Sequence, residues 1–251
     1  MTTHGTEGAR SPDANCANCA DPLSVGQRFC ARCGQKADTK RLTLHELGHE
    51  LLHALVHVDR SVLTLVRALL FEPGRVAAGY VAGRRRRHIG PFAFLVVVVA
   101  LTSAEIAASG FHAVTADVPN VVGDFLQRHV NLVFFAQIPL LALFNRLLAW
   151  SQRFNYSEHL VLAAYTGAIH ILCYAVLVIP GWLLLRQDPA LATHLYYAYL
   201  PLWPLYFGFA NSQFLEGPRW WSALRGVAAL LLSQGTTLLI VSAVTALFEG
   251  Q

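Results

Sequence analysis

The chain has 251 residues, of which 55% are hydrophobic and 14% are charged, and its mean hydropathy is +0.44. Soluble domains carry about 25% charged residues, so this composition excludes an ordinary soluble globule and predicts a membrane protein. Residues 1–90 hold 13 of the 19 Lys and Arg and 8 of the 15 Asp and Glu, whereas residues 91–251 hold 6 and 7. A head with a formal charge of +5 favours anionic lipid headgroups over nucleic acid as its partner, since its arginines adjoin a membrane segment.

The first 15 residues are polar and contain Gly5, Gly8 and Pro12, which predicts a disordered tail over residues 1–15. They include no apolar run, so we expect no cleavable signal peptide. Insertion into the membrane then depends on the first transmembrane helix.

Four cysteines follow with the spacing Cys16-x2-Cys19-x10-Cys30-x2-Cys33. Each C-x2-C pair forms a turn that directs both sulfurs to one side, and two such turns supply a tetrahedron of thiolates. This spacing predicts a structural zinc ribbon over residues 16–35. Gly34 suits the positive φ that follows such a turn, whereas Ala20 departs from the pattern. Disulfides in an oxidising compartment, or a redox role, are the alternatives.

Residues 42–90 are predicted to form amphipathic juxtamembrane helices, joined to the ribbon by a short polar linker over residues 35–41. Thr43 suits a helix N-cap, and Glu46 three residues later completes a capping box. Apolar residues then recur every three or four positions as far as Leu69, which is the helical period. Pro73-Gly74 ends this stripe.

A row of histidines, His45, His49, His53 and His57, lies on the face opposite the apolar stripe. The strings HELGH and HELLH match a zinc-hydrolase pattern, in which two histidines bind zinc and a glutamate is the general base. The head leaves too few residues for a protease domain around this helix, so we assign no catalytic residue. A second metal site, a pH-responsive row and a solvated polar face all stay open.

Four consecutive arginines, Arg84, Arg85, Arg86 and Arg87, stand directly before the first long apolar run. Such a cluster is typical of a positive-inside anchor, which places the head in the cytoplasm. A specific pocket for a lipid headgroup is the alternative interpretation.

The head and the junction together carry a recognisable series of residues. It consists of Cys16, Cys19, Cys30, Cys33-Gly34-Gln35, Arg41, Thr43, His53, His57, Asp59, Thr64-Leu65, Pro73-Gly74, Tyr80, Gly83-Arg84-Arg85 and Pro91-Phe92. Over roughly residues 16–95 this series resembles a bacterial membrane family, domain-of-unknown-function family 3667. The resemblance implies a zinc-ribbon head before a multi-span membrane region. It implies no activity, because none is assigned to that family.

Five segments have spanning length, about 20 apolar residues for a hydrocarbon core about 30 Å thick. They lie at residues 91–110, 130–149, 160–184, 194–215 and 223–247. The sequence therefore predicts an all-α polytopic membrane protein, with about five transmembrane helices over residues 91–251 and a small N-terminal cytoplasmic zinc ribbon. Arginines concentrate in the loops that this topology places inside, so we expect a C-terminus outside the inner membrane. Kinks are expected at Pro139, Pro180, Pro201 and Pro204.

Two ionisable residues fall within the predicted spans, Glu105 in the first and His170 in the third. Intramembrane ionisable residues are candidates for function, and these two are placed to pair. Alternatively, Glu105 lies near the interface and His170 makes a hydrogen bond between helices, as Asn211 and Gln213 are also expected to do.

These observations favour a non-enzymatic role in interaction, recruitment or regulation, in which the ribbon binds a cytoplasmic protein partner. One alternative is a transporter or channel for a small solute or ion that uses Glu105 and His170. Another is a zinc hydrolase built on the HELGH/HELLH helix.

Overall fold

The computed structural model describes residues 15–24, 26–39, 41–44, 61–86, 89–111, 135–185 and 187–249. Residues 1–14 of the predicted tail, the histidine row and Arg87 lie outside the described residues. In chain order the helices are α2 (Ser61–Phe71), α3 (Pro73–Val81), α4 (Pro91–Ser109), the helix Phe135–Leu148, α6 (Tyr156–Cys173), the π-helical η1 (Tyr174–Val178), α7 (Ile179–Leu185), α8 (Pro189–Tyr199), α9 (Leu202–Phe214) and α10 (Arg219–Glu249). Within the described ranges, β-structure consists of two isolated bridges, both in the four-cysteine segment that is called the ribbon below.

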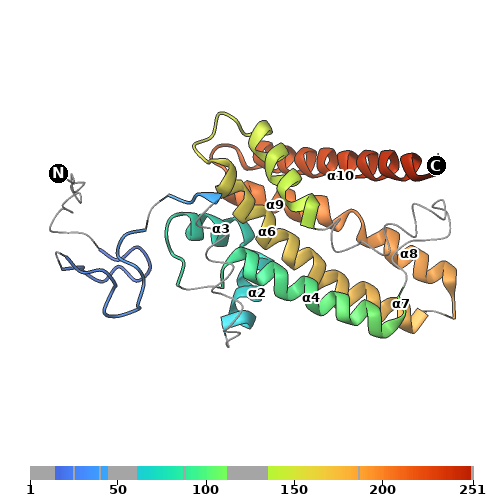
Figure 1. Cartoon of the computed structure of the whole chain (residues 1–251), viewed down its shortest axis with the longest axis horizontal. Coiled ribbons are helices and arrows are strands. Elements are labelled where there is room, and N and C mark those ends of the chain that lie inside the picture. The colour runs from blue at the N-terminus through green and yellow to red at the C-terminus, as the bar shows by residue number, and fades with distance from the viewer. Residues whose placement is uncertain are drawn as a thin grey trace.

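Helix α6 is the central element of the bundle. Every residue from Ser157 to Ile169 is buried, so neighbouring elements cover this helix on all sides. Helix α4 packs along it, and α3 and α9 also contact it (Figure 1). Tyr165 is fully buried and anchors this core, because its hydroxyl donates a hydrogen bond of 2.7 Å to the carbonyl oxygen of Ile89, just before α4.

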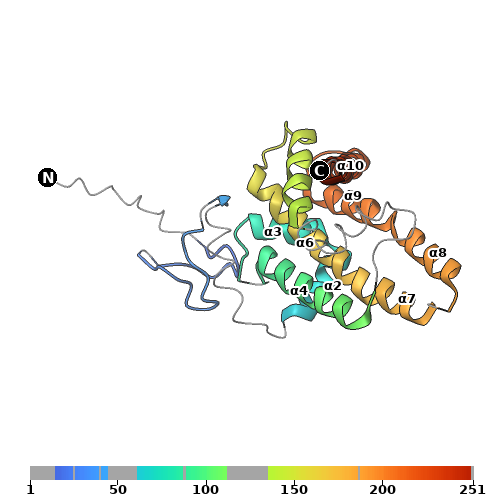
Figure 2. The ribbon, with the colours of Figure 1, turned by 45° about the vertical axis from the view of Figure 1, so that its right-hand side comes forward.

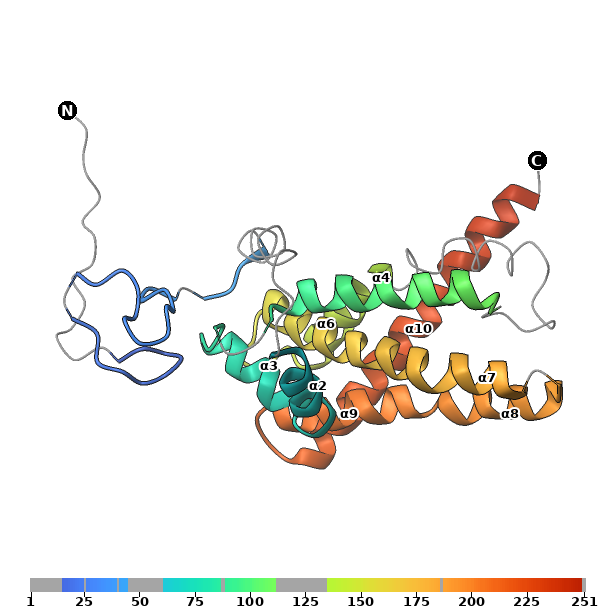
Figure 3. The ribbon, with the colours of Figure 1, turned by 90° about the horizontal axis from the view of Figure 1, so that it is seen from below.

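The ribbon projects from one end of the helix bundle (Figure 1). Helices α4, α6 and α10 begin at that end and run away from it, whereas α8 and α9 together return toward it (Figures 1 and 3). Helix α10 packs along α9, and Figure 2 views α10 nearly along its axis. Helix α6, the pair α8 and α9, and helix α10 therefore alternate in direction along the chain, as successive helices do in a polytopic bundle.

Three helices are long and apolar enough to cross a membrane, namely Pro91–Ser109, Tyr156–Leu185 and Arg219–Val244. They correspond to the first, third and fifth predicted spans, which makes this chain a helical membrane protein. The second predicted span is described from residue 135 as the shorter apolar helix Phe135–Leu148. The fourth is divided into α8 and α9 at Leu200–Pro201, where proline removes a backbone hydrogen-bond donor.

The helix Tyr156–Leu185 changes its hydrogen-bond pattern before Pro180. Proline cannot donate to the carbonyl one turn earlier, and its ring clashes with that carbonyl in a regular α-helix. The chain adopts the wider π-helical turn η1 over Tyr174–Val178 at this point. A kink is expected at Pro180, and what the structure shows before this residue is a π-helical turn within a continuous helix.

The juxtamembrane helices lie against the bundle. Leu65 and Leu69 of the predicted apolar stripe are fully buried, and α2 packs on α3 and α6. Pro73 begins α3 directly after α2 ends, and Gly74 lies so close to α9 that a Cβ atom there would overlap the carbonyl oxygen of Ala210. Gln213 of α9 accepts from the backbone N–H of Gly74 and donates to the carbonyl of Phe71, so it fastens this corner.

Candidate metal centre and its attachment to the bundle

The two C-x2-C segments fold into a pair of matching turns. The N–H of Cys16 donates to the carbonyl of Asp21, and the N–H of Cys30 donates to the carbonyl of Gln35, both at 2.8 Å. Each turn is flanked by an antiparallel bridge, Asn15 with Pro22 in the first and Phe29 with Lys36 in the second. The structure therefore contains the two knuckles that the cysteine spacing predicts.

The residue after each knuckle has a left-handed backbone. Gly34 has a φ of +69°, which confirms the expectation for this position. Ala20 has a φ of +60° and is the non-glycine residue with positive φ in the described part of the chain. Its side chain makes that conformation cost about 1 kcal/mol, so the first knuckle keeps the required geometry at a penalty.

The four cysteine sulfurs converge on one point. The Sγ atoms of Cys16, Cys19, Cys30 and Cys33 all lie within 4.8 Å of one another. The pairs Cys16–Cys33 and Cys19–Cys30 are separated by 3.6 Å, too far for a disulfide, and all four are free thiols. Metal–sulfur bonds of about 2.3 Å in a tetrahedron separate the sulfurs by about 3.8 Å. The residues therefore fit a four-coordinate metal ion, with all positions taken by protein ligands.

Backbone donors prepare these sulfurs to bind a cation. The N–H of Gln35 donates to Cys33, and together with Asn18 and two neighbouring thiols it lowers the pKa of Cys33 to about 6. The N–H of Asp21 likewise donates to Cys19, but burial and the other three sulfurs outweigh it and raise the pKa of Cys19 to about 12. Thiolates held this close repel one another, and a bound dication offsets that repulsion.

Gln35 joins the second knuckle to the arginine segment. Its side chain is 4% exposed, its Nε2 donates to the carbonyl of Gly83 at 3.2 Å, and its Oε1 accepts from the N–H of Arg86 at 3.0 Å. The Arg86 guanidinium covers Gly34, because a Cβ atom on that glycine would lie 2.9 Å from Nη2. Gly83 has a φ of +96° and lies against Thr39 and Ala17. The ribbon is therefore docked onto residues 83–86.

The described arginines of the predicted anchor contact the protein as well as solvent. Arg84 folds over Gly79, and Arg85 is half-buried with its guanidinium 5.9 Å from the ring centre of Tyr80. Arg84 and Arg86 keep exposed surface, which leaves them accessible to headgroups. The arginine segment is thus a folded part of the head.

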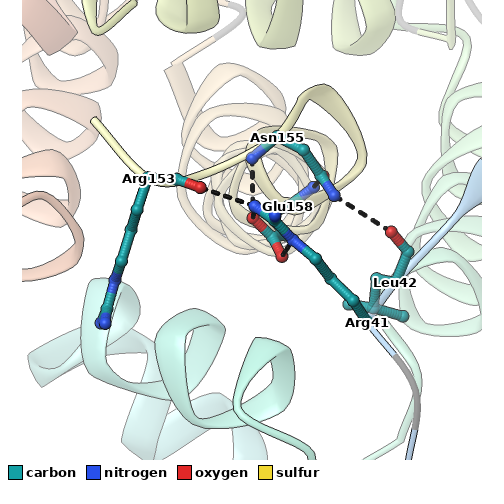
Figure 4. Close-up of polar contacts among 5 residues, drawn as sticks. All are labelled: Arg41, Leu42, Arg153, Asn155 and Glu158. Atoms are coloured by element: carbon teal, nitrogen blue, oxygen red, sulfur yellow. Dashed lines mark hydrogen bonds and ion pairs between the residues drawn. The ribbon is translucent and has the colours of Figure 1, made fainter. Parts of the chain in front are cut away.

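A second attachment joins residues 41–42 to the start of α6 (Figure 4). Arg41 donates to both carboxylate oxygens of Glu158, from Nε at 2.9 Å and from Nη2 at 3.0 Å, and Nη2 also donates to the carbonyl of Arg153 at 2.5 Å. This pairing raises the pKa of Arg41. Glu158 and Asn155 form a capping box, and Asn155 also donates to the carbonyl of the buried Leu42. The segment predicted to be a short polar linker is therefore held at both of its ends.

A buried polar cluster lies next to this attachment, and Asn211 is the one member of it that sequence reasoning identified. Asn145 and Asn211 exchange two hydrogen bonds of 2.6 and 3.2 Å, and Asn145 also lies 3.0 Å from Nδ1 of His159. All three side chains are fully buried, and Phe154 and Phe214 flank the histidine ring. The expected role of Asn211 between helices is confirmed. His159 follows the polar residues Ser157 and Glu158, and the apolar run that begins at Leu160 was its only visible signal.

The two intramembrane candidates, His170 and Glu105, have separate interactions. His170 stacks on Trp203 with ring centres 4.5 Å apart, and Nδ1 lies 3.0 Å from the hydroxyl of Tyr199, which donates to the His170 carbonyl. Glu105 is half-buried on α4. Among the interactions of the described residues, a Glu105–His170 pair is absent. His170 instead holds α6 against the proline-interrupted pair α8 and α9.

Comparison with known proteins finds a family match for one segment of this chain. The model of a family described as a protein of unknown function, DUF3667, matches residues 59–102. We found no match for the chain among curated proteins or among solved structures. The matched segment covers α2, α3 and the first half of α4, and it overlaps the predicted resemblance from residue 59 onward. This part of the chain is therefore similar to the DUF3667 family.

Proposed function

We propose that this chain is a non-enzymatic membrane protein whose zinc ribbon serves as an interaction or regulatory module at the cytoplasmic face. The observation that carries the proposal is the double attachment of the four-cysteine site to the bundle, through Gln35 and through Arg41. A module held in this way keeps a fixed orientation relative to the membrane. A docked module is better suited to recruitment or signalling than a module on a flexible tether.

The donor set supports zinc as the metal. Four thiolates in a tetrahedron are typical of structural zinc sites, in which every coordination position is taken by protein. Few side chains of the ribbon are buried, and two of the three buried apolar residues are themselves cysteines, Cys16 and Cys30. The ribbon therefore depends on its metal for stability, and the metal has no open position for substrate.

Charge and aromatic residues support a cytoplasmic position for the ribbon end. Arg153 pairs with Glu216 at 3.1 Å and so lies beside the start of α10, and Arg225 stacks over Trp221 at 5.2 Å. Trp150 and Trp220 are 76% and 66% exposed, as expected for side chains at headgroup level. By the positive-inside rule, these features support our proposal of a cytoplasmic ribbon, five crossings and an outside position for the end of α10.

The exposed face of the ribbon supports a protein partner. Phe29 is 59% exposed and lies opposite Lys36 across a β-bridge, so the two side chains share one face. Arg28 and Arg32 are also exposed nearby in sequence. An exposed aromatic residue among cations suits an acidic partner with an apolar anchor.

Metal analysis of the purified full-length protein tests the proposal. We expect one zinc per chain in the wild type and almost none in Cys16→Ser, whereas His49→Ala keeps one. The histidine row lies outside the described residues, so this variant also tests the hydrolase alternative. Two zinc ions per chain, of which one is lost in His49→Ala and kept in Cys16→Ser, would favour the hydrolase.

A further inference from the structure

We propose that Gln35 couples metal occupancy of the four cysteines to the position of the arginine segment, residues 84–86. The metal-loaded ribbon would hold these arginines against the head, and metal loss would release them. The inference rests on the proposed metal site and adds a regulatory property to it. Gln35 is the residue at which the metal site and the arginine segment meet.

The main chain of Gln35 belongs to the metal site. Its carbonyl accepts from the N–H of Cys30, and its own N–H donates to the sulfur of Cys33. Both bonds exist only while the second knuckle is folded. Since the ribbon has almost no apolar core of its own, we expect loss of the metal to unfold the knuckle and displace Gln35.

The side chain of Gln35 belongs to the junction. Both ends of its buried amide are satisfied by the main chain of residues 83–86, through the carbonyl of Gly83 and the N–H of Arg86. Displacing the amide leaves the N–H of Arg86 without its partner and leaves the carbonyl of Gly83 with the N–H of Arg85 alone, and it exposes the contact between Arg86 and Gly34 to solvent. The turn at Gly83 then loses the surface that it rests on.

The coupling must act in both directions. If metal binding favours the docked arginine segment, the docked segment favours metal binding by the same factor. Two neutral hydrogen bonds together contribute about a tenfold factor to such an equilibrium. A change at either end of the Gln35 contact should therefore alter both the release of metal and the exposure of the arginines.

Trypsin provides the test, because it cuts after arginine. The full-length protein in lipid nanodiscs is treated with limiting trypsin, and mass spectrometry quantifies the cuts after Arg84, Arg85 and Arg86. We expect zinc-loaded wild type to be protected and chelation to raise the cutting rate roughly tenfold. Gln35→Ala should be cut at the higher rate even with zinc bound, and chelator should strip its zinc roughly tenfold faster.

Two further variants separate coupling from damage to the ribbon. Gln27→Ala removes a glutamine of the same ribbon that bonds only locally, to the N–H of Ser24, and should match wild type in both measurements. Gly83→Ala changes the junction end and no knuckle residue: at a φ of +96° its Cβ would lie 3.0 Å from Thr39 Oγ1, and 3.4 Å from the Cβ of Ala17, which is an ordinary contact distance. It should speed zinc release although no ribbon knuckle is changed, which keeps the test valid if Gln35→Ala does not hold zinc.

The outcomes are distinct. A zinc-loaded wild type whose cutting rate ignores chelation overturns the coupling and leaves the metal site intact. Zinc release from Gly83→Ala at the wild-type rate overturns the coupling in the same way. A wild type that holds no metal overturns the proposed function itself, and the coupling with it.

Discussion

Arg41 and Glu158 are 117 residues apart in the chain and form a bidentate ion pair at the N-terminus of α6. The carboxylate side is buried, with 5% of its side chain exposed, whereas 61% of the Arg41 side chain is exposed. Glu158 at the same time caps α6 through Asn155. One exposed arginine therefore closes the end of the central helix and fastens the segment that leads from the ribbon.

We expect Arg41→Ala to lower the melting temperature of the detergent-solubilised protein, because it leaves the buried Glu158 carboxylate without its cation. Differential scanning fluorimetry measures the change. Arg75→Ala is the matched control, since it removes the exposed pair of Arg75 with Glu72 at 2.8 Å, and exposed pairs contribute little. Equal melting temperatures for the two variants would contradict a structural role for the Arg41–Glu158 pair.

The segment matched by the DUF3667 model owes its packing to a few small or aromatic residues. Gly74 allows α3 to approach α9, and Tyr80 packs edge-on against Tyr165 with ring centres 5.9 Å apart. Gly83 supplies the left-handed turn on which the ribbon rests. The matched segment thus contacts the ribbon, the central helix α6 and helix α9, and connects them.

Gly74→Ala should destabilise the protein by about 3 kcal/mol, at the upper end of the usual cost of overpacking. A Cβ atom there would overlap the backbone of Ala210 and lie 2.8 Å from the backbone nitrogen of Phe214, and neither can move without shifting α9. Gly235→Ala on α10 is the control, because no atom of the described residues, apart from the adjacent backbone of its own helix, lies within 4 Å of its Cβ position. Alanine there should be neutral or stabilise the helix by about 0.5–1 kcal/mol. Thermal unfolding of both variants in the same detergent measures the two changes in stability.

Ala20→Gly should stabilise the ribbon by about 0.5–1 kcal/mol, since glycine adopts a φ of +60° without a steric penalty but loses more entropy on folding. The chelator concentration that removes half of the zinc measures this change. Gly34→Ala is the mirror experiment at the second knuckle and should have the opposite sign, because its Cβ also meets Arg86. A lower chelator midpoint for Ala20→Gly would show that the backbone at residue 20 is not strained.

Local spacing explains what could be predicted from the sequence. The convergence of the four sulfurs and the positive φ of Gly34 depend on residues within one short segment, and both agree with the structure. The prediction of the three long spans rests on continuous hydropathy, which does not change with the tertiary arrangement. The break between α8 and α9 at Pro201 and the π-helical turn before Pro180 follow from the N–H that proline lacks, although Pro139 lies within the helix Phe135–Leu148.

The contacts that join the ribbon to the bundle could not be predicted in this way. Gln35 and Arg41 look like ordinary polar residues of a linker, and their partners lie 48 and 117 residues away. His159 stands near a predicted helix start, where a solvated histidine is common, yet it is fully buried because Phe154, Phe214 and Asn145 surround it. These positions are decided by tertiary packing, which periodicity and spacing do not encode.

The amide pair Asn145–Asn211 yields the last prediction. Its two hydrogen bonds join the helix Phe135–Leu148 to α9, and Asn211 also fits against Gly226 of α10, whose Cβ position lies 2.6 Å from Asn211 Nδ2. Asn145→Leu leaves the buried Asn211 amide without its partner, and Asn211→Leu leaves Asn145 with His159 alone; each variant should cost about 1–3 kcal/mol. The double variant removes both amides, so it should be less destabilised than the sum of the single variants by about 1 kcal/mol. A double-mutant cycle on thermal unfolding measures this coupling. Additive losses would mean that the two amides contribute separately.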